Sequence, residues 1–350
     1  MTKFEFLWLL AAGSAGYLFW GFRTLPREEW QIMAALPVRR SRGGVWQGMN
    51  LTWYGFFSAN AYLAAVVLFL LLTGALGLQP AALGVFVAGL LGICVPASRW
   101  VARLVEGKAH TMTVGGAVFV GLLISPFVLL AGNRVAAELG LAPLPTLPVL
   151  AALGIAYAFG EGLGRLACLS FGCCYGKALA GSPPLLRLML GRFSLRFFGA
   201  TKKIAYAGGL EGERVLPVQA LTALVCVVTG LVGSALYLEK NFATAFLVAV
   251  ATTQMWRVFS EFLRADFRGS GRLTAYQWMA LAGIPYAAGL VSTAGPAPMM
   301  DPAIGAGLAA LWTPQALLCL QVLWLLIFFC TGRSSVTSAT LEFQVCRERI

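Results

Sequence analysis

The sequence predicts an all-α polytopic membrane protein with about nine transmembrane helices and a small interfacial head or arm. Of the 350 residues, 59% are hydrophobic and only 11% are charged, whereas about a quarter of the residues in soluble domains are charged. Apolar runs long enough to cross roughly 30 Å of hydrocarbon as helices recur along the chain. The short alternating strands that a membrane barrel needs are not evident in the sequence.

Nine helices are predicted from the apolar runs and the residues that break them. The first run has no small-residue cleavage site behind it, which favours a retained helix over a signal peptide. The predicted ranges are 5–22, 52–75, 80–98, 112–132, 146–168, 216–238, 243–263, 274–293 and 311–331.

Two polar segments interrupt these helices. The insert 176–215 predicts a small head or amphipathic arm, and the basic loop 23–51 predicts a segment along the membrane interface. The chain therefore divides into three parts. These are N-terminal helices (1–104), a membrane core (105–293), and a last helix with a tail (294–350).

Basic residues are distributed unequally between the two ends of the predicted helices. The net charge is +12, and 21 of the 26 Lys and Arg residues fall in the tail and the loops after the first, third, fifth and seventh helices. Such a bias normally marks the cytoplasmic side of a membrane protein. With nine spans these basic segments all fall on one side of the membrane, whereas with eight or ten spans they would not. Since the basic residues do not interleave with aromatics on a polar domain, we expect no nucleic-acid partner.

The eight cysteines have irregular spacing. That spacing indicates neither a disulfide framework nor a zinc pattern. We expect no metal and no cofactor.

Four ionisable residues lie within the fifth and seventh predicted helices. Glu161 and Arg165 are four residues apart, and Arg257 and Glu261 repeat the spacing in reversed order. Charges within a membrane are costly and usually functional. One interpretation is that each pair neutralises itself along its own helix. The other is that the two arginines meet around a common ligand.

Glycines favour the second interpretation. Arg165 lies in "GEGLGRLACLSFGCCYGK" (160–177), whose glycines allow close approach of helices and ligands. Both arginines lie toward the basic end. Two guanidinium groups in a glycine-lined pocket suit a phosphate, which in a membrane belongs to a phospholipid headgroup.

Two further segments lie toward the same end. Gly115 and Gly116 open the fourth predicted helix in "HTMTVGGAVFVGLL", and they allow another close backbone approach. His110, the only histidine, is either a base or an interfacial polar residue. Gln219 in "RVLPVQAL" either binds a headgroup or caps a neighbouring helix.

In these four segments the chain resembles the prolipoprotein diacylglyceryl transferase family, over roughly residues 105–290. The family motif Gly-Arg-x-x-Asn-Phe-x-Asn-x-Glu-x-x-Gly is matched here at Gly164, Arg165 and Gly176. The family's His-Gly-Gly segment corresponds to 114–116, and its His-Pro-x-Gln segment corresponds to 216–219. The late Arg-x-x-x-Glu-Phe-x-Arg segment is matched by Arg257, Glu261, Phe262 and Arg264, followed by Asp266 and Trp278.

The chain departs from the family at several positions. Cys168, Phe171 and Cys173 replace the two Asn residues and the Glu of the main motif. Val114, Leu216 and Thr222 replace two histidines and a glutamate. The "GCCYG" sequence therefore indicates a divergent branch, in which binding of the lipid headgroup carries over better than the identity of the acceptor.

The resemblance implies a membrane enzyme that moves the diacylglyceryl group of phosphatidylglycerol to a thiol or hydroxyl acceptor in a bacterial plasma membrane. Arg165 and Arg257 would hold the phosphate, oriented by Glu161 and Glu261. Arg264 would add a further contact to the substrate.

Other residues near this site keep alternative roles. Cys168 or Cys173 is either a nucleophile, activated by Arg165, or a small hydrophobe. Tyr175 is either a base or a headgroup contact.

Two other functions use the same arginines. One is a lipid or small-anion transporter, although the chain has no internal repeat. The other is a lipid-binding scaffold without catalysis.

The family's active site faces outward, whereas both arginines here lie at the basic end. Either the positive charge attracts anionic lipid, or the protein is inverted and works at the cytoplasmic leaflet.

Overall fold

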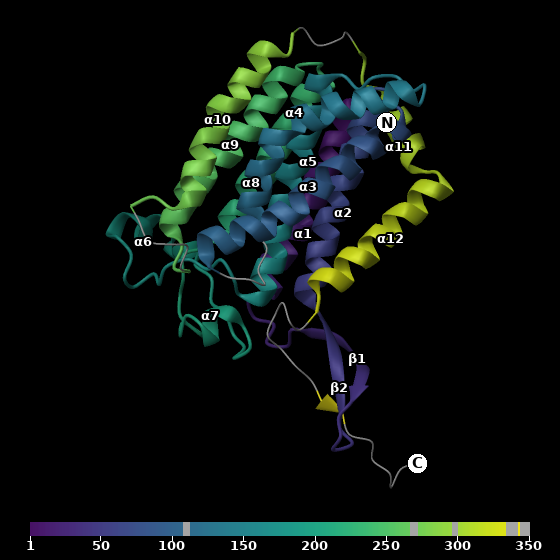
Figure 1. Cartoon of the computed structure of the whole chain (residues 1–350). Helices are drawn as coiled ribbons and strands as arrows, with labels where there is room; N and C mark the ends of the chain where they lie inside the picture. The colour runs from purple at the N-terminus through teal and green to yellow at the C-terminus, as the bar shows by residue number, and fades with distance from the viewer. Residues whose placement is uncertain (108–112, 267–271, 296–299, 334–341, 344–350) are drawn as a thin grey trace.

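The apolar runs of the sequence fold into a bundle of helices in the computed structural model (Figure 1). The structure describes residues 1–107, 113–266, 272–295, 300–333 and 342–343. The helices are α1 (Lys3–Thr24), α2 (Trp53–Ala75), α3 (Pro80–Glu106), α4 (Val114–Glu138), α5 (Thr146–Phe171), α6 (Pro184–Leu190), α7 (Lys203–Tyr206), α8 (Val218–Leu238), α9 (Phe242–Leu263), α10 (Ala275–Thr293), α11 (Ile304–Leu311) and α12 (Pro314–Thr331). The strands are β1 (Ile32–Arg40), β2 (Trp46–Thr52) and β3 (Glu342–Phe343).

Each of the nine predicted membrane helices corresponds to a helix in the described part of the chain. Seven of them are long and apolar enough to cross a membrane: α2, α3, α4, α5, α8, α9 and α12. The protein is therefore an all-α integral membrane protein. The remaining two, α1 and α10, are long enough but fall short of that composition. A total of nine spans stays a prediction.

Helix α5 is the centre of the bundle. It packs against α2, α8 and α9, and 67% of its most apolar stretch is buried, compared with 6% for α12 at the edge. Small residues allow these close contacts. A side chain added at Gly154 would meet Ala249 of α9 at 3.2 Å, and one at Gly162 would meet the Ala223 carbonyl of α8 at 3.1 Å. Since α2 belongs to the N-terminal part, that part and the core share one bundle.

One end of the bundle carries all the larger polar segments (Figure 1). The loop predicted for 23–51 contains an antiparallel hairpin of β1 and β2, extended by β3. Gly44 allows its turn, with a φ of +82°. These strands were missed by the sequence analysis because their polar and apolar residues do not alternate regularly. Pro37 also lies at an irregularity in the pairing register.

The insert after α5 lies at the same end and contains α6 and α7 (Figure 1). Three large apolar side chains of α6, Leu185, Leu188 and Met189, are more than 60% exposed. An apolar exposed face at the end of a membrane bundle suits an arm that lies in the membrane interface. A short bridge between Gly176 and Arg264 connects the insert to the end of α9.

Lys202 anchors this insert to the end of α1. The side chain is fully buried, its Nζ donates a hydrogen bond to the Leu25 carbonyl at 2.7 Å, and it lies 5.8 Å from the centre of the Phe197 ring. Burial lowers the pKa of Lys202 from 10.5 to about 8, although Glu28 partly opposes the shift. The pKa of Lys202 is lowered because burial disfavours the charged ammonium form and no carboxylate of the described residues forms an ion pair with it.

This pKa predicts a pH dependence of stability. Between about pH 8 and pH 10.5 the folded protein has lost the Lys202 proton while the unfolded chain keeps it. Stability therefore rises with pH across this window, by up to about 3 kcal/mol from this residue. Denaturant titrations in mild detergent at several pH values should show a smaller rise for Lys202→Met than for wild type. Lys203→Met is the matched control, and an unchanged rise in Lys202→Met would contradict the assignment.

Candidate functional site

The two membrane arginines lie at the same depth in adjacent helices. Arg165 is six residues before the last residue of α5, and Arg257 is six residues before the last residue of α9. At 1.5 Å per residue, both lie about 9 Å inside the ends of their helices. Both ends are at the basic face of the bundle (Figure 1). The arginines therefore lie closer to this end of the bundle than to its middle.

The two guanidinium groups meet around the carboxylate of Glu161. Arg165 pairs with Glu161 along α5, and Nη2 of Arg257 approaches Glu161 Oε1 at 3.4 Å from α9. Nη2 of Arg257 also donates to the Tyr157 hydroxyl at 3.3 Å. The side chains are 6% to 14% exposed. The approach predicted for the two arginines is thus present, with a carboxylate between them.

Glu261 belongs to a second ion-pair group at the end of α9. It lies 3.7 Å from Arg264, whose Nε and Nη2 donate to the two Asp266 carboxylate oxygens at 2.8 and 2.7 Å. Of the two pairs expected along single helices, Glu161 with Arg165 is present, whereas no ion pair within 4.0 Å joins Arg257 to Glu261 among the described residues. Tertiary packing brings Glu161 to Arg257, and the chain turn after Leu263 brings Arg264 back to Glu261.

These charged groups line one narrow pocket between α5, α8 and α9. Its lining contains three arginines and two glutamates, and Asp266, which pairs with Arg264, balances the third arginine. The remaining free space is about 20 Å³, near the volume that one water requires. The buried Nε of Arg257 has no hydrogen-bond partner among the described residues. The pocket is thus rich in guanidinium groups and has one unused hydrogen-bond donor. The lining residues are Tyr157, Glu161, Arg165, Thr222, Cys226, Thr253, Trp256, Arg257, Ser260, Glu261 and Arg264.

An apolar groove adjoins this pocket on the outer surface of α8 and α9. Its free volume is about 360 Å³, and Trp256 lines both spaces. Met255 and Phe259 line the groove and are 40% and 56% exposed. The indole Nε1 of Trp256 donates to Thr222 at 2.9 Å, which orients the ring between the two spaces. The polar pocket and the apolar groove therefore lie on either side of Trp256.

The four predicted glycines have different positions. A side chain at Gly115 would meet Nη1 of Arg257 at 2.5 Å, so this glycine borders the arginine directly. Gly116 packs against Val101 and Thr113, and Gly164 faces Ala61 of α2. Gly176 approaches the Leu216 carbonyl. Gly116 and Gly164 support helix packing around the site, and Gly176 forms a short backbone bridge with Arg264.

Gln219 and Tyr175 support the segment that follows α5. The Gln219 amide donates to the Cys173 carbonyl at 2.9 Å, while its buried Oε1 has no partner in the described part of the chain. The Tyr175 carbonyl accepts a hydrogen bond from Ala265 at 3.0 Å. Burial, Asp266 and Tyr206 raise the pKa of Tyr175, so it is a poor base at neutral pH.

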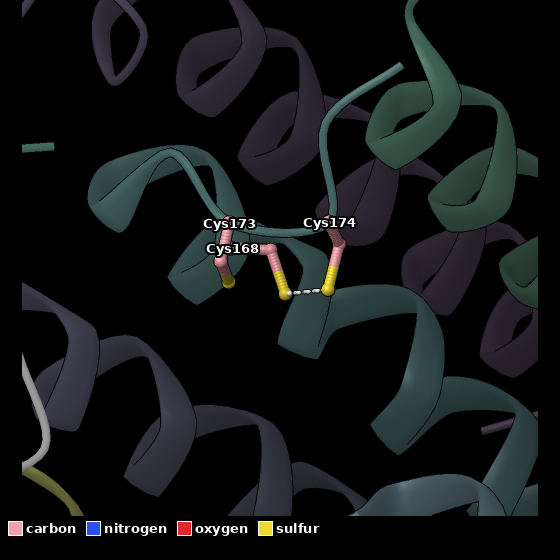
Figure 2. Close-up of side chains that lie close together, drawn as sticks. All are labelled: Cys168, Cys173 and Cys174. Carbon is pink, nitrogen blue, oxygen red and sulfur yellow. Dashed lines mark hydrogen bonds between the residues drawn. The ribbon is translucent and has the colours of Figure 1, made fainter. Parts of the chain in front are cut away.

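The two predicted cysteines belong to a cluster of three. The sulfur atoms of Cys168, Cys173 and Cys174 all lie within 4.8 Å of one another, and their side chains point to the same side of the turn (Figure 2). Nη1 of Arg165 lies 4.0 Å from the Cys168 sulfur. Interactions with the Cys168 and Cys174 thiols, together with burial, raise the pKa of Cys173. Activation of Cys173 as a thiolate by Arg165 is therefore disfavoured.

Some residues of the site were not found from the sequence, and one predicted residue cannot be placed. Tyr157 is one helical turn before Glu161, and the shared spacing 157, 161, 165 was the signal that could have identified it. Cys174 was missed because only the fold of the turn brings it to Cys168. His110 lies outside the described residues.

Comparisons with known proteins do not assign the chain to a family. No family model matches it, and no curated protein matches it significantly. Its function is therefore inferred from the chemistry of the site.

Removing the central carboxylate tests this geometry. Glu161→Gln leaves two largely buried guanidinium groups without their shared anion, and it should lower the free energy of unfolding by about 3–5 kcal/mol. Denaturant titration of the protein in a zwitterionic detergent measures the change. The exposed Glu138→Gln provides the control. Equal stability of Glu161→Gln and wild type would show that the ion pairs contribute little to the fold.

Proposed function

We propose that this protein is a phospholipid-dependent transferase whose headgroup site is the arginine pocket between α5 and α9. It would move a diacylglyceryl or related lipid group from an anionic phospholipid, such as phosphatidylglycerol, to a thiol or hydroxyl acceptor. The observation that carries the proposal is the meeting of Arg165 and Arg257 around one anionic group. A phosphate satisfies the same donors, because guanidinium groups bind phosphate and carboxylate in the same paired geometry.

We propose that the phosphate takes the position that the Glu161 carboxylate holds between the two arginines. Since the free space is about 20 Å³, a phosphate enters only if the arginines move away from Glu161. The Nε donor of Arg257, which has no partner within the described residues, then gains an acceptor. Glu161 pairs with both arginines in the structure described.

The apolar groove favours a lipid over a free phosphate. A phospholipid has a charged headgroup joined to acyl chains, and the pocket and groove meet at Trp256 in the same order. Met255 and Phe259 present apolar surface along the groove.

The depth of the site supports a headgroup enzyme over a transporter. Transporter sites lie near the middle of the membrane. Arg165 is about 9 Å from one end of α5 and about 28 Å from the other. The pocket therefore lies at the level of a single leaflet.

The proposed reaction is a displacement at the glycerol carbon. The acceptor loses its proton, its sulfur or oxygen forms a bond to this carbon, and the carbon–oxygen bond to the phosphate breaks. The phosphate monoester leaves with the bonding electrons. Arg165 and Arg257 stabilise the charge that develops on its oxygens. Glu161 would orient Arg165 and Arg257, and Glu261 would orient Arg264.

The resemblance to the diacylglyceryl transferase family supports the same assignment. The matched residues Arg165, Arg257 and Arg264 all line the pocket. The replaced positions Cys168 and Cys173 lie in the thiol cluster beside it. The part of the site that would handle the acceptor therefore differs from the family pattern, and the acceptor is left as a thiol or hydroxyl.

Replacing the arginines tests the reaction. Arg165→Gln or Arg257→Gln should reduce release of glycerol phosphate from phosphatidylglycerol nanodiscs by about 100-fold or more, because each removes a donor to the leaving phosphate. A small thiol, dithiothreitol, serves as acceptor, and the exposed Arg134→Gln is the control. No glycerol phosphate from wild type, with lipid binding that still requires Arg165, would exclude the transferase. Lipid movement between leaflets would instead identify a transporter.

Gly115→Ala tests the position of Arg257 without changing a charge. The added methyl group would meet Nη1 of Arg257 and the Tyr276 ring. Because the arginine end is flexible, we expect Arg257 to move and phosphatidylglycerol binding to weaken by about tenfold, with little loss of stability. Gly84→Ala is the matched control, since nothing lies within 4 Å of an added side chain there. Unchanged lipid binding in Gly115→Ala would place the headgroup elsewhere.

A further inference from the structure

We propose that Cys168, Cys173 and Cys174 form a three-thiolate site for a thiophilic d¹⁰ metal ion, Zn²⁺ or Cu⁺. The sequence analysis expected no metal, because the spacing Cys-x₄-Cys-Cys is not a zinc pattern. The structure brings the three sulfur atoms together at the end of α5. The site goes beyond the proposed transferase and does not depend on it.

The sulfur positions match the requirements of such an ion. Zinc–sulfur bonds of about 2.3 Å at tetrahedral or trigonal angles place neighbouring sulfurs roughly 3.8–4.0 Å apart. The sulfur atoms of Cys168 and Cys174 are 3.9 Å apart, and all three lie within 4.8 Å of one another. Only small movements are therefore needed to close the three thiols around one ion.

The fold holds the three cysteines in this arrangement. Helix α5 ends at Gly172 with a φ of +68°, and the Cys173 amide donates to the Cys168 carbonyl at 3.1 Å. Cys174 has a φ of +57°, one of two such values for described residues other than glycine. Gln219 binds the Cys173 carbonyl. The left-handed cysteine costs about 1 kcal/mol or more, and it turns the third sulfur toward the other two (Figure 2).

The surrounding charges suit an anionic metal–thiolate group. Three thiolates and one Zn²⁺ have a net charge of −1, and with Cu⁺ the charge is −2. Nη1 of Arg165 lies 4.0 Å from the Cys168 sulfur. Soft thiolate ligands select these ions over Mg²⁺ or Ca²⁺. Metal binding itself deprotonates the thiols, and Arg165 would offset part of the negative charge of the metal–thiolate group.

The fourth coordination position would be filled from outside the cluster. No further His, Cys, Asp or Glu joins the three thiols in the part of the chain that the structure describes. Metal sites with three protein ligands keep one position for water or substrate. Arg165 contacts both Cys168 and Glu161, so the metal would lie directly beside the anion pocket.

Metal content and cobalt spectroscopy test the site in the full-length protein. The detergent-purified protein, reduced with a phosphine, should bind one equivalent of Zn²⁺ or Cu⁺ by elemental analysis. With Co²⁺ as probe, it should show a thiolate-to-cobalt charge-transfer band and four-coordinate d–d bands. Added 2-mercaptoethanol should shift these bands, and an unchanged spectrum would refute the open fourth position.

Serine variants identify the ligands. Cys168→Ser, Cys173→Ser and Cys174→Ser should each weaken metal binding by more than about 100-fold. Loss of a residue that only supports a ligand already weakens binding by up to about 100-fold, and these variants each lose a ligand itself. Cys226→Ser, a buried cysteine of the same pocket outside the cluster, should bind normally. Retained stoichiometric binding in all three cluster variants would overturn the proposal.

A measurement on the wild-type chain avoids variants that fail to fold. Zn²⁺ should protect the three clustered thiols from alkylation, read by mass spectrometry, while the exposed Cys319 and Cys330 still react. Unprotected cluster thiols would overturn the site. A metal-free protein with a disulfide between Cys168 and Cys174 would identify a redox pair in its place. Neither outcome changes the test of glycerol phosphate release, so the two proposals fail separately.

Discussion

The carboxylate of Glu161, shared by two arginines from different helices, is the interaction on which the rest of the site depends. A single buried arginine in a membrane helix is costly, and two beside one another would repel. The negative charge of Glu161 compensates both positive charges, and it reaches both arginines only because α5 and α9 approach closely. Gly154 and Gly162 remove the side chains that would hold the neighbouring helices away. Helix packing and charge compensation therefore require each other.

The same packing gathers the charged groups of the pocket. Tertiary contacts place Arg165, Arg257 and Arg264 around a space lined by two glutamates, and Asp266 pairs with Arg264. The loop after α5 and the end of α9 are joined by backbone hydrogen bonds, from Lys177 to Leu263 and from Ala265 to Tyr175. The position of Arg264 is thus tied to the insert. The head segment and the charged pocket form one structural unit at the basic end of the bundle.

The thiol cluster and the anion pocket are neighbours through Arg165. Its guanidinium pairs with Glu161 and also lies beside the Cys168 sulfur. In the diacylglyceryl transferase family that the chain resembles, amide and carboxyl side chains occupy two of these three cysteine positions. The replacement exchanges hard oxygen donors for soft sulfur donors, while Arg165, Arg257 and Arg264 match the family pattern. Chemistry at the acceptor side of the site is where this chain and that family would differ.

The sequence by itself determined the fold class and the positions of the long helices, because a hydrocarbon environment leaves helices of about twenty apolar residues as the main solution. It also identified Arg165, Arg257 and Glu161, because charges in such runs are conspicuous. Tertiary structure alone decided which carboxylate forms an ion pair with each arginine. Arg257 pairs with Glu161 on α5, whereas Glu261 on its own helix pairs with Arg264. It likewise decided the grouping of Cys174 with Cys168, which depends on a left-handed turn that no spacing rule encodes. The hairpin at 32–52 was not predicted for a related reason. Contacts between its strands set the pairing, and its polar and apolar residues do not alternate regularly in the sequence.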